Sequence, residues 1–271
     1  MSKVRLDLLL VERSLAESRT KAQALVMAGQ VRVDGQVELK SSAQIPPDAQ
    51  LDLEMGLRFV SRGGDKLEAG LLVFPLDVAG RICADVGAST GGFTDCLLQH
   101  GAARVYSIDV GKGILHWKLR SDPRVHVMEE TNARYVESLP EPVSLVTIDA
   151  SFISLKILLP VVKGWLPSSP DPIPSRALGP SREGSVIVLI KPQFEAGRKE
   201  SARHKGVIRD PSVHRTILMD MLDFARGQGF GVRGLLRSPV LGPKGNVEFL
   251  AWLRLGDAEQ NDFASLVDQV T

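Results

Sequence analysis

The sequence predicts an α/β protein whose larger part is an open sheet of about seven strands, with a small α+β unit before it. From Ile82 onward, apolar runs of strand length alternate with segments of helical periodicity, which is typical of doubly wound sheets. The first run ends at Asp85 and breaks into glycines, and open α/β sheets bind nucleotides at such a break. We expect strands at residues 82–86, 104–108, 125–128, 143–148, 186–190, 230–238 and 247–255.

The first 58 residues follow another pattern. Two helical segments, 5–12 and 18–28, precede two short apolar runs, 31–33 and 37–39. Ser18 is a suitable N-cap and Gly29 a suitable stop for the second helix. The pair Asp34-Gly35 favours a tight hairpin turn between the two runs. We therefore expect a small domain over 1–58, a linker over 59–64 and the α/β domain over 65–271.

Composition limits the classes of function. The chain has 33 Lys+Arg against 32 Asp+Glu, so its net charge of +1 does not predict nucleic-acid binding, which would have to come from local clusters. Its two cysteines, Cys83 and Cys96, have neither a disulfide nor a metal-ligand spacing, and no metal is expected. No cleavable leader and no apolar run of membrane-spanning length is found, so we expect a cytoplasmic protein.

The glycine-rich segment after the first strand is the candidate cofactor site. Gly87, Gly91 and Gly92 leave room for a ligand, but their spacing is not that of the G-x-G-x-x-G dinucleotide fingerprint. A cofactor with an amino-acid tail and a ribose fits better than one with a pyrophosphate. Asp109 ends the next strand about twenty residues later, where an acid can bind ribose hydroxyls. Its alternative role is a helix cap before Gly111.

Four segments carry a family resemblance: Asp85 to Thr94, Thr147 to Ser154, Leu189 to Glu195, and Lys205 to Asp210. In this order they resemble the haemolysin A (TlyA) family, whose Rossmann-like domain is similar to the FtsJ-type ribose methyltransferases. The first 58 residues resemble the S4-type RNA-binding module. The resemblance implies S-adenosyl-L-methionine as cofactor, bound by Asp85, Gly87, Ser89, Gly91, Gly92 and Phe93, by Asp109 at the ribose, and by Thr131, Asn132 and Ala133 at the adenine.

The resemblance also implies a catalytic set of Lys66, Asp149, Lys191 and Glu248. A ribose hydroxyl is a poor nucleophile, and a lysine can act as its base when burial or a neighbouring cation lowers the lysine pKa. Lys191 directly follows five apolar residues, where a charge is costly unless it is paired or faces a cleft. Each residue has a structural alternative: an exposed first turn for Lys66, a helix cap for Asp149 and a solvated sheet face for Glu248.

The acceptor can be narrowed further. Asp149-Ala150-Ser151-Phe152 stands where adenine amino-methyltransferases commonly have an Asp/Asn-Pro-Pro-aromatic motif, which favours an oxygen acceptor. Neither cysteine lies in a nucleophilic motif, which argues against carbon-5 methylation. A ribose 2′-hydroxyl fits best, and because it distinguishes RNA from DNA the expected substrate is RNA. Phe152 either stacks on a base or packs in the core.

Basic residues outside the catalytic set are candidate RNA contacts. Arg19 and Lys21 begin the second helix, where backbone amides could help to hold phosphate. A solvated helix face is the alternative. The full candidate set is Arg5, Arg19, Lys21, Arg62, Arg198, Lys199, Arg203 and Lys205, the last four in a loop that could also be merely solvated. Residues 167–185 contain five prolines and are expected to form a surface insertion.

The function implied by the resemblance is 2′-O-methylation of ribosomal RNA, on cytidine, in the small or large ribosomal subunit or in both. Two alternatives remain at this stage. One is a ribosome-assembly factor that binds RNA and cofactor without turnover, against which the complete catalytic set counts. The other, suggested by the haemolysin name, is a membrane-lytic protein, which the lack of a long apolar segment disfavours.

Overall fold

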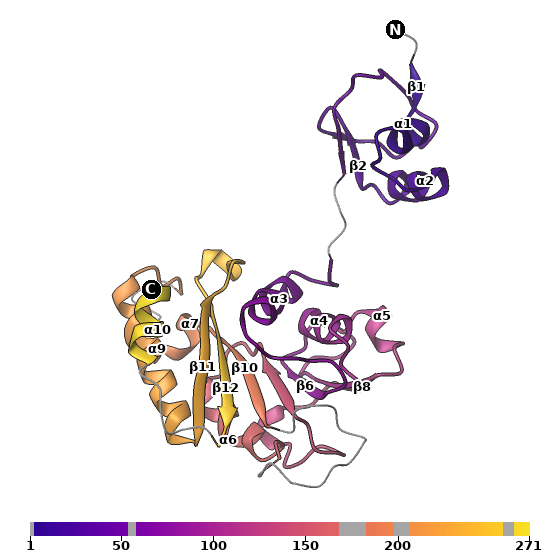
Figure 1. Ribbon diagram of the computed structural model, residues 1–271. Helices are drawn as coiled ribbons and strands as arrows, with labels where there is room; N and C mark the ends of the chain where they lie inside the picture. The colour runs from indigo at the N-terminus through magenta and orange to yellow at the C-terminus, as the bar shows by residue number, and fades with distance from the viewer. Residues whose placement is uncertain (1–2, 54–57, 168–182, 198–205, 257–262) are drawn as a thin grey trace. The chain divides into compact units, whose positions relative to one another are not determined.

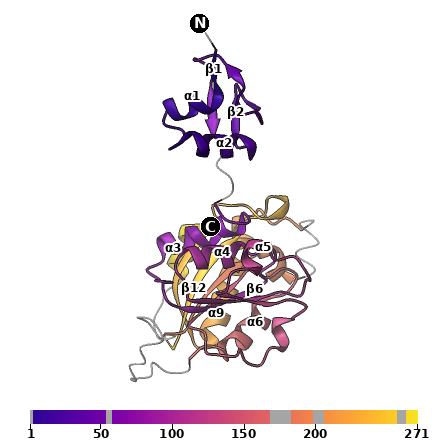
Figure 2. The same cartoon turned by 90° about the vertical axis from the view of Figure 1, so that its right-hand side faces the viewer.

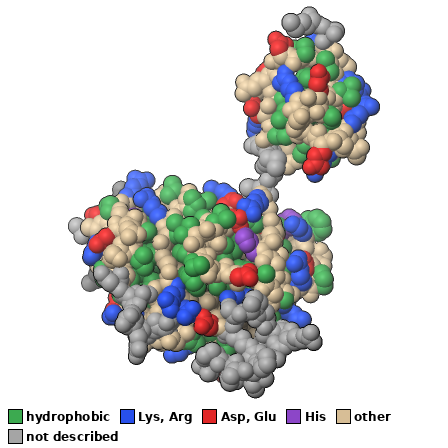
Figure 3. Space-filling view, in the orientation of Figure 1, with side chains coloured by type: hydrophobic (Ala, Val, Ile, Leu, Met, Phe, Trp, Pro, Cys, Tyr) green, Lys and Arg blue, Asp and Glu red, His purple; other side chains and the backbone are tan. Residues whose placement is uncertain are grey.

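The computed structural model describes residues 3–53, 58–167, 183–197, 206–256 and 263–271, and divides into two compact units, Met1–Arg58 and Phe59–Thr271 (Figure 1). The breaker-rich segment expected at 167–185 lies, for residues 168–182, outside the described part. Surface charges of both signs are interspersed on the visible face of each unit (Figure 3).

The first unit is built from two helices and two small sheets. Its elements are β1 (Val4–Arg5), α1 (Leu6–Glu12), α2 (Arg19–Met27), β2 (Val31–Val33), β3 (Gln36–Val37), β4 (Gln44–Ile45) and β5 (Leu51–Leu53). Strand β2 pairs antiparallel with β3 and β5, and β1 pairs with β4. Ser18 caps α2 by accepting the Lys21 N–H, as predicted. Leu6, Leu10 and Val26 lie at the centre of the core.

The second unit is a seven-stranded sheet, which confirms the predicted fold class. The strands are β6 (Ile82–Val86), β7 (Arg104–Ile108), β8 (Val125–Met128), β9 (Leu145–Ile148), β10 (Ser185–Ile190), β11 (Phe230–Arg237) and β12 (Phe249–Leu255). Their order is β11-β12-β10-β9-β6-β7-β8, with β12 antiparallel to both neighbours and the other pairs parallel. Strands β6, β7, β9 and β10 are largely buried because helices cover both faces of the sheet, whereas the edge strand β8 is half-exposed.

The helices form a layer on each face (Figures 1 and 2). Helices α3 (Gly63–Val73), α4 (Gly92–Gln99) and α5 (Trp117–Arg120) contribute to the core on one face. Helices α6 (Leu155–Lys163), α9 (Pro211–Gly227) and α10 (Phe263–Val270) contribute to the core on the other. Two further short elements near the site are α7 (Pro192–Glu195) and the 3-10 turn η2 (Pro243–Gly245). No helix of the described residues is both long and apolar enough to cross a bilayer.

Strand order places the site. The chain runs outward from β6 in both directions, to β7 on one side and to β9 on the other, so a topological switch point lies between β6 and β9. Ligands of open α/β sheets bind in the crevice outside the carboxyl ends of strands at such a point. Gly87 follows β6 there and Asp149 follows β9.

The segment expected to be a linker, 59–64, belongs to the second unit. Phe59 is buried in the core that faces α3 and α4, and α3 begins at Gly63, inside the expected linker. An added Cβ on Gly64 would lie 2.2 Å from Phe59 Cγ, so only a glycine allows the ring this position. The Gly63-Gly64 pair therefore marks close packing against Phe59 and not a flexible linker.

Candidate active site

A cavity of about 780 Å³ opens at the carboxyl ends of β6, β9 and β10. It brings together all four residues of the predicted catalytic set, Lys66, Asp149, Lys191 and Glu248. Four predicted cofactor residues, Gly87, Ser89, Gly92 and Phe93, and the predicted RNA contact Arg62 also line it. Residues from distant parts of the sequence thus share one crevice.

Lys191 and Asp149 form a close ion pair at the cavity wall. Lys191 follows the last residue of β10, and Pro192 begins α7 directly after it, so the chain turns at this lysine. Its Nζ lies 2.6 Å from Asp149 Oδ1 and donates to Ser151 Oγ at 3.1 Å. The side chain is nearly buried, with 9% exposed. The helix-cap alternative for Asp149 does not describe this contact.

Lys66 and Glu248 form the second pair. Lys66 lies in the first turn of α3 and donates from Nζ to Glu248 Oε2 at 2.5 Å. Glu248 is fully buried, so neither the exposed first turn nor the solvated sheet face describes these residues. Among the described residues, Glu248 Oε1 has no hydrogen-bond partner. A buried acceptor on a cavity wall without a partner is costly unless a ligand supplies the donor.

The glycine loop is shaped by close approach. Gly87 has φ +81°, and an added Cβ would lie 2.8 Å from Asp149 O. A Cβ on Gly92, at the start of α4, would lie 2.4 Å from Ser61 Oγ and 2.7 Å from Gly64 N. The loop therefore contacts the backbone that carries Asp149 and the start of the helix that carries Lys66.

Asp85 directly precedes the glycine loop in β6, and Asp109 is hydrogen-bonded to the loop. Asp85 is fully buried and does not line the cavity; it accepts hydrogen bonds from Thr94 Oγ1 at 2.7 Å and Thr147 Oγ1 at 3.0 Å. Burial raises the pKa of its carboxyl to about 7. Asp109 accepts the Ser89 N–H at 2.8 Å through Oδ2 and the Gly111 N–H at 2.7 Å through Oδ1. The second contact closes a local turn, but no helix begins at Gly111, so the helix-cap alternative is wrong. The first contact joins Asp109 to the loop.

The remaining predicted cofactor residues lie beside the cavity rather than in its wall. Gly91 precedes α4 and faces Leu119. Thr131, Asn132 and Ala133 follow β8; the Thr131 N–H donates to Asp109 O at 2.9 Å, and the Asn132 side chain caps the 3-10 turn that begins at Ala133. Backbone contact with Asp109 keeps this segment at the carboxyl edge of the sheet.

Phe152 is exposed, which excludes its core-packing alternative. Its side chain is 90% exposed at the cavity lining, with the backbone in the left-handed region at φ +64°. Its ring centroid lies 5.0 Å from that of Phe194. Sequence reasoning missed Phe194 and the loop from Val240 to Asn246, which also line the cavity. A signal was present for both: the loop contains Gly242, Lys244 and Gly245, and Phe194 lies in the Leu189 to Glu195 segment that carries the family resemblance.

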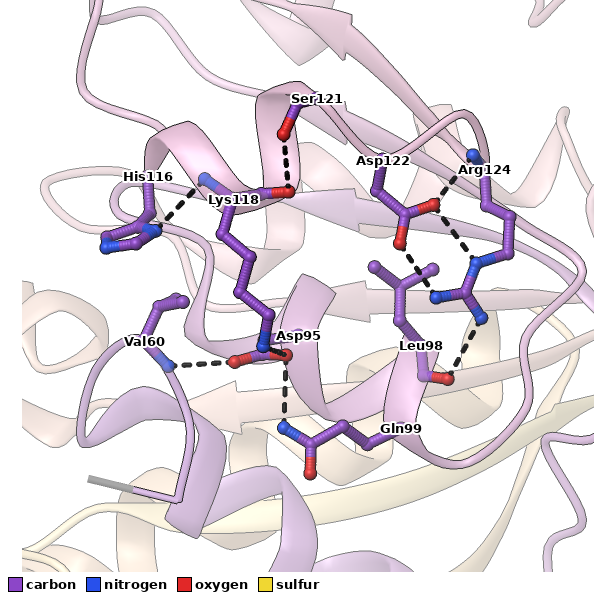
Figure 4. A network of polar contacts seen from close by, with 9 residues as sticks. All are labelled: Val60, Asp95, Leu98, Gln99, His116, Lys118, Ser121, Asp122 and Arg124. Atoms are coloured by element: carbon purple, nitrogen blue, oxygen red, sulfur yellow. Dashed lines mark hydrogen bonds and ion pairs between the residues drawn. The ribbon is translucent and has the colours of Figure 1, made fainter. Parts of the chain in front are cut away.

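Asp95 is a second residue that the sequence did not reveal. It lies buried in the first turn of α4 and accepts the Val60 N–H at 2.9 Å and Gln99 Nε2 at 3.1 Å (Figure 4). Lys118 Nζ reaches the same carboxylate at 3.6 Å. These contacts fix the segment before α3, so that Ser61 and Arg62 meet the cavity.

The predicted RNA contacts fall into three groups. In the first unit, Arg5 and Arg19 both contact Asp7, and Lys21 is exposed. In the second unit, Arg62 lines the cavity. Arg198, Lys199, Arg203 and Lys205 lie outside the described residues.

The chain is similar to known proteins over nearly its whole length. The model for the FtsJ-like methyltransferases matches residues 59–255 and that for the S4 domain matches residues 4–51. YqxC of Bacillus subtilis is 46% identical, over 93% of this chain and 85% of that protein. The 16S/23S rRNA (cytidine-2'-O)-methyltransferase TlyA of Mycobacterium tuberculosis is 41% identical, over 93% of this chain and 90% of that protein. A solved structure described as a hemolysin from Streptococcus thermophilus is 42% identical, with TM-score 0.68, and covers 99% of this chain and 96% of that one.

Proposed function

The chain belongs to the FtsJ-like methyltransferase family, and from this premise we propose that it methylates a cytidine 2′-hydroxyl of ribosomal RNA, with S-adenosyl-L-methionine as donor. Family membership confirms the resemblance found in the sequence and the methyltransferase class. Substrate and position are proposed from the relatives named for that reaction and from the S4 domain. A ribosomal substrate would place the reaction in the cytoplasm. The observation that carries the proposal is one cavity lined by the glycine loop and by both lysine–carboxylate pairs.

The residues present fit the cofactor. The glycine loop is held so tightly at Gly87 and Gly92 that the backbone itself forms the cradle, and the first N–H groups of α4 follow it directly. Asp109 is bound to the same loop through Ser89 and can offer carboxylate oxygens to ribose hydroxyls. When bound, the cofactor supplies a methyl group already activated on a sulfonium. The protein then has to position the acceptor hydroxyl and remove its proton.

Lys191 is the residue we assign to that proton. Its Nζ can take the hydroxyl proton as one of its own protons passes to Asp149 Oδ1, 2.6 Å away, so that the proton ends on the carboxylate and the lysine remains charged. Ser151 Oγ accepts a second hydrogen bond from Nζ and fixes its direction. Glu248 Oε1, buried and without a partner among the described residues, can accept a hydrogen bond from an N–H or O–H donor of the bound substrate or cofactor other than the reacting hydroxyl. Lys66 holds Glu248 in place through the other oxygen.

Phe152 supports a nucleic-acid acceptor. Phe152 has a left-handed backbone, and its large apolar side chain is exposed to water. Both features are unfavourable, and strained residues of this kind concentrate at functional sites. A base of single-stranded RNA can stack on an exposed aromatic ring. With Phe194 beside it, Phe152 can hold the base while the ribose reaches Lys191.

The test is transfer of tritiated methyl from S-adenosyl-L-methionine to purified small and large ribosomal subunits, followed by nuclease digestion and identification of the labelled nucleoside. Label on cytidine 2′-oxygen is the expected result. Lys191→Ala should lower kcat by about 10² to 10⁴-fold, the usual contribution of general acid–base catalysis, while cofactor affinity stays near that of the wild type.

Lys156→Ala is the matched control, because it also removes a lysine that lies 2.6 Å from an aspartate, Asp220, but on the surface. Its rate should stay within about twofold of the wild type, since exposed pairs contribute little. Wild-type turnover in Lys191→Ala would remove Lys191 from the mechanism. No transfer to either subunit, with cofactor and RNA both bound, would favour the non-catalytic assembly factor.

A further inference from the structure

Asp7 is the most buried charged group of the first unit. It lies in the first turn of α1 and is 0% exposed, although a lone carboxylate in that position would carry a large desolvation cost. Both of its oxygens accept hydrogen bonds. Arg5 donates from Nε to Oδ1 at 3.0 Å and from Nη2 to Oδ2 at 2.8 Å, a two-point contact. Arg19 Nε and Gln23 Nε2 donate to Oδ2 at 3.0 and 2.8 Å.

The two arginines remain accessible on their outer sides. The Arg5 side chain is 34% exposed and that of Arg19 is 54% exposed. Within the described part of the chain, Arg19 meets Asp7 through Nε alone, so both of its terminal NH₂ groups are available to a ligand. Hydrogen bonding to Arg5 holds the pKa of the Asp7 carboxyl well below its usual range. Two guanidinium groups therefore face solvent around one carboxylate, with a net charge of +1.

We infer that Asp7 is a positioning residue that presents Arg5 and Arg19 as one binding site for an RNA phosphate. The inference rests on the proposed RNA substrate. Arg5 comes from β1 and Arg19 from the first turn of α2, and Asp7 is the side chain that both of them contact. A guanidinium binds phosphate best through a fixed pair of N–H groups, and anchoring each arginine on Asp7 fixes its direction. The nine-residue α2 is capped by Ser18, and the backbone N–H groups at its N-terminus add partial positive charge beside Arg19.

The proposal can be separated from simple electrostatics because the two predict opposite signs. Asp7→Asn keeps the shape of the side chain and removes a negative charge from a surface that binds a polyanion. If net charge governed binding, this variant would bind RNA more tightly. If Asp7 positions the arginines, the variant should bind about tenfold more weakly, and its affinity should depend less steeply on salt, because one phosphate contact is lost.

The experiment is filter binding of the full chain to deproteinised ribosomal RNA at several salt concentrations. Gln23→Ala is the matched control: it removes a neutral hydrogen bond to Asp7, 2.8 Å long, and leaves both arginine contacts, so its affinity should stay within about threefold. Arg19→Lys keeps the charge at an exposed site and loses the fork, so it should weaken binding like Asp7→Asn. Thermal unfolding of each variant establishes that the first unit is folded.

Tighter binding by Asp7→Asn, or unchanged binding by Arg19→Lys, would overturn the inference. Equal losses in Asp7→Asn and Gln23→Ala would also overturn it, because they would assign Asp7 to the fold of the unit alone. The proposed function fails separately, if the wild-type chain does not bind ribosomal RNA at all.

Discussion

Gly87→Ala tests whether the glycine loop packs against the backbone of Asp149, to which we assign the proton of the acceptor hydroxyl. Gly87 has φ +81°, and its added Cβ would lie 2.8 Å from Asp149 O and 3.0 Å from Ala150 Cα. The left-handed backbone alone costs a residue with a Cβ about 1–2 kcal/mol. Backbone atoms cannot move aside as a side-chain end can, so overpacking adds about 1–3 kcal/mol. The total expected loss in the free energy of unfolding is about 2–5 kcal/mol.

Gly256→Ala is the matched control. Gly256 has φ +83°, nearly the same backbone, but nothing lies within 4 Å of its added Cβ. It follows β12, which runs antiparallel to β10, so it lies at the edge of the sheet opposite the cavity. This variant should lose only the backbone cost of about 1–2 kcal/mol. A unit of this size melts about 2–4 °C lower for each kcal/mol, so the two variants should differ clearly in Tm.

Activity should separate the two variants further. A shift of Asp149 by a few tenths of an ångström moves the partner of Lys191, and small misplacements in a catalytic site can cost about 10²-fold in rate. The rate of methyl transfer should therefore fall by about 10- to 100-fold in Gly87→Ala and stay near that of the wild type in Gly256→Ala. Urea unfolding and the tritium assay measure the two quantities. Equal stability of the two variants, together with wild-type turnover in Gly87→Ala, would refute the close approach and the role given to Asp149.

Two further predictions concern Asp85 and Phe152. The pKa of Asp85 is raised from 3.8 to about 7, so the folded state binds its proton more tightly and this group's contribution to stability falls as pH rises through that window. In urea unfolding between pH 5 and 8, the free energy of unfolding of the wild type should fall relative to that of Asp85→Asn as the pH rises, by up to about 1.4 kcal/mol per pH unit below pH 7. A difference between the two that does not depend on pH would contradict the assignment. Phe152→Gly should leave the free energy of unfolding unchanged or raise it by about 1 kcal/mol, because it relieves the backbone at φ +64°, while kcat/KM for RNA falls. A parallel loss of stability and activity would mean that the ring supports the fold.

The sequence predicted the sheet well because its central strands are covered on both faces. Continuous apolar runs such as Val186 to Ile190 have no polar side to present, and each ends at a charged or glycine residue where the chain leaves the core. All seven strands were predicted, with ends that differ by at most two residues. The assignment of 59–64 as a linker was wrong because a glycine pair marks close packing as readily as a break, and the two cannot be told apart without the partner, Phe59.

The site could be predicted only in part. Residue types at strand ends suggested Lys191 and Asp149, but nothing local to Lys66 indicates a partner 182 residues away. Asp85 looked like a ligand contact because it ends a strand next to the loop. It lies instead on the buried side, bound to Thr94 and Thr147. Period-two alternation in a strand decides which way such a side chain points, and one residue of register reverses it.

The antiparallel strand β12 explains how Glu248 reaches the site. Parallel strands place the residues that follow them at the carboxyl edge of the sheet, which accounts for Gly87, Asp149 and Lys191. Glu248 precedes its strand, and in a parallel strand it would lie at the opposite edge, about 20 Å away over seven residues. Because β12 is reversed, Ile190 pairs with Phe249, and Lys191 and Glu248 come next on each side of that pair. The reversed strand thus brings the Glu248 carboxylate to the carboxyl edge of the sheet. In an all-parallel sheet, a side chain at that edge would have to come from a residue that follows a strand.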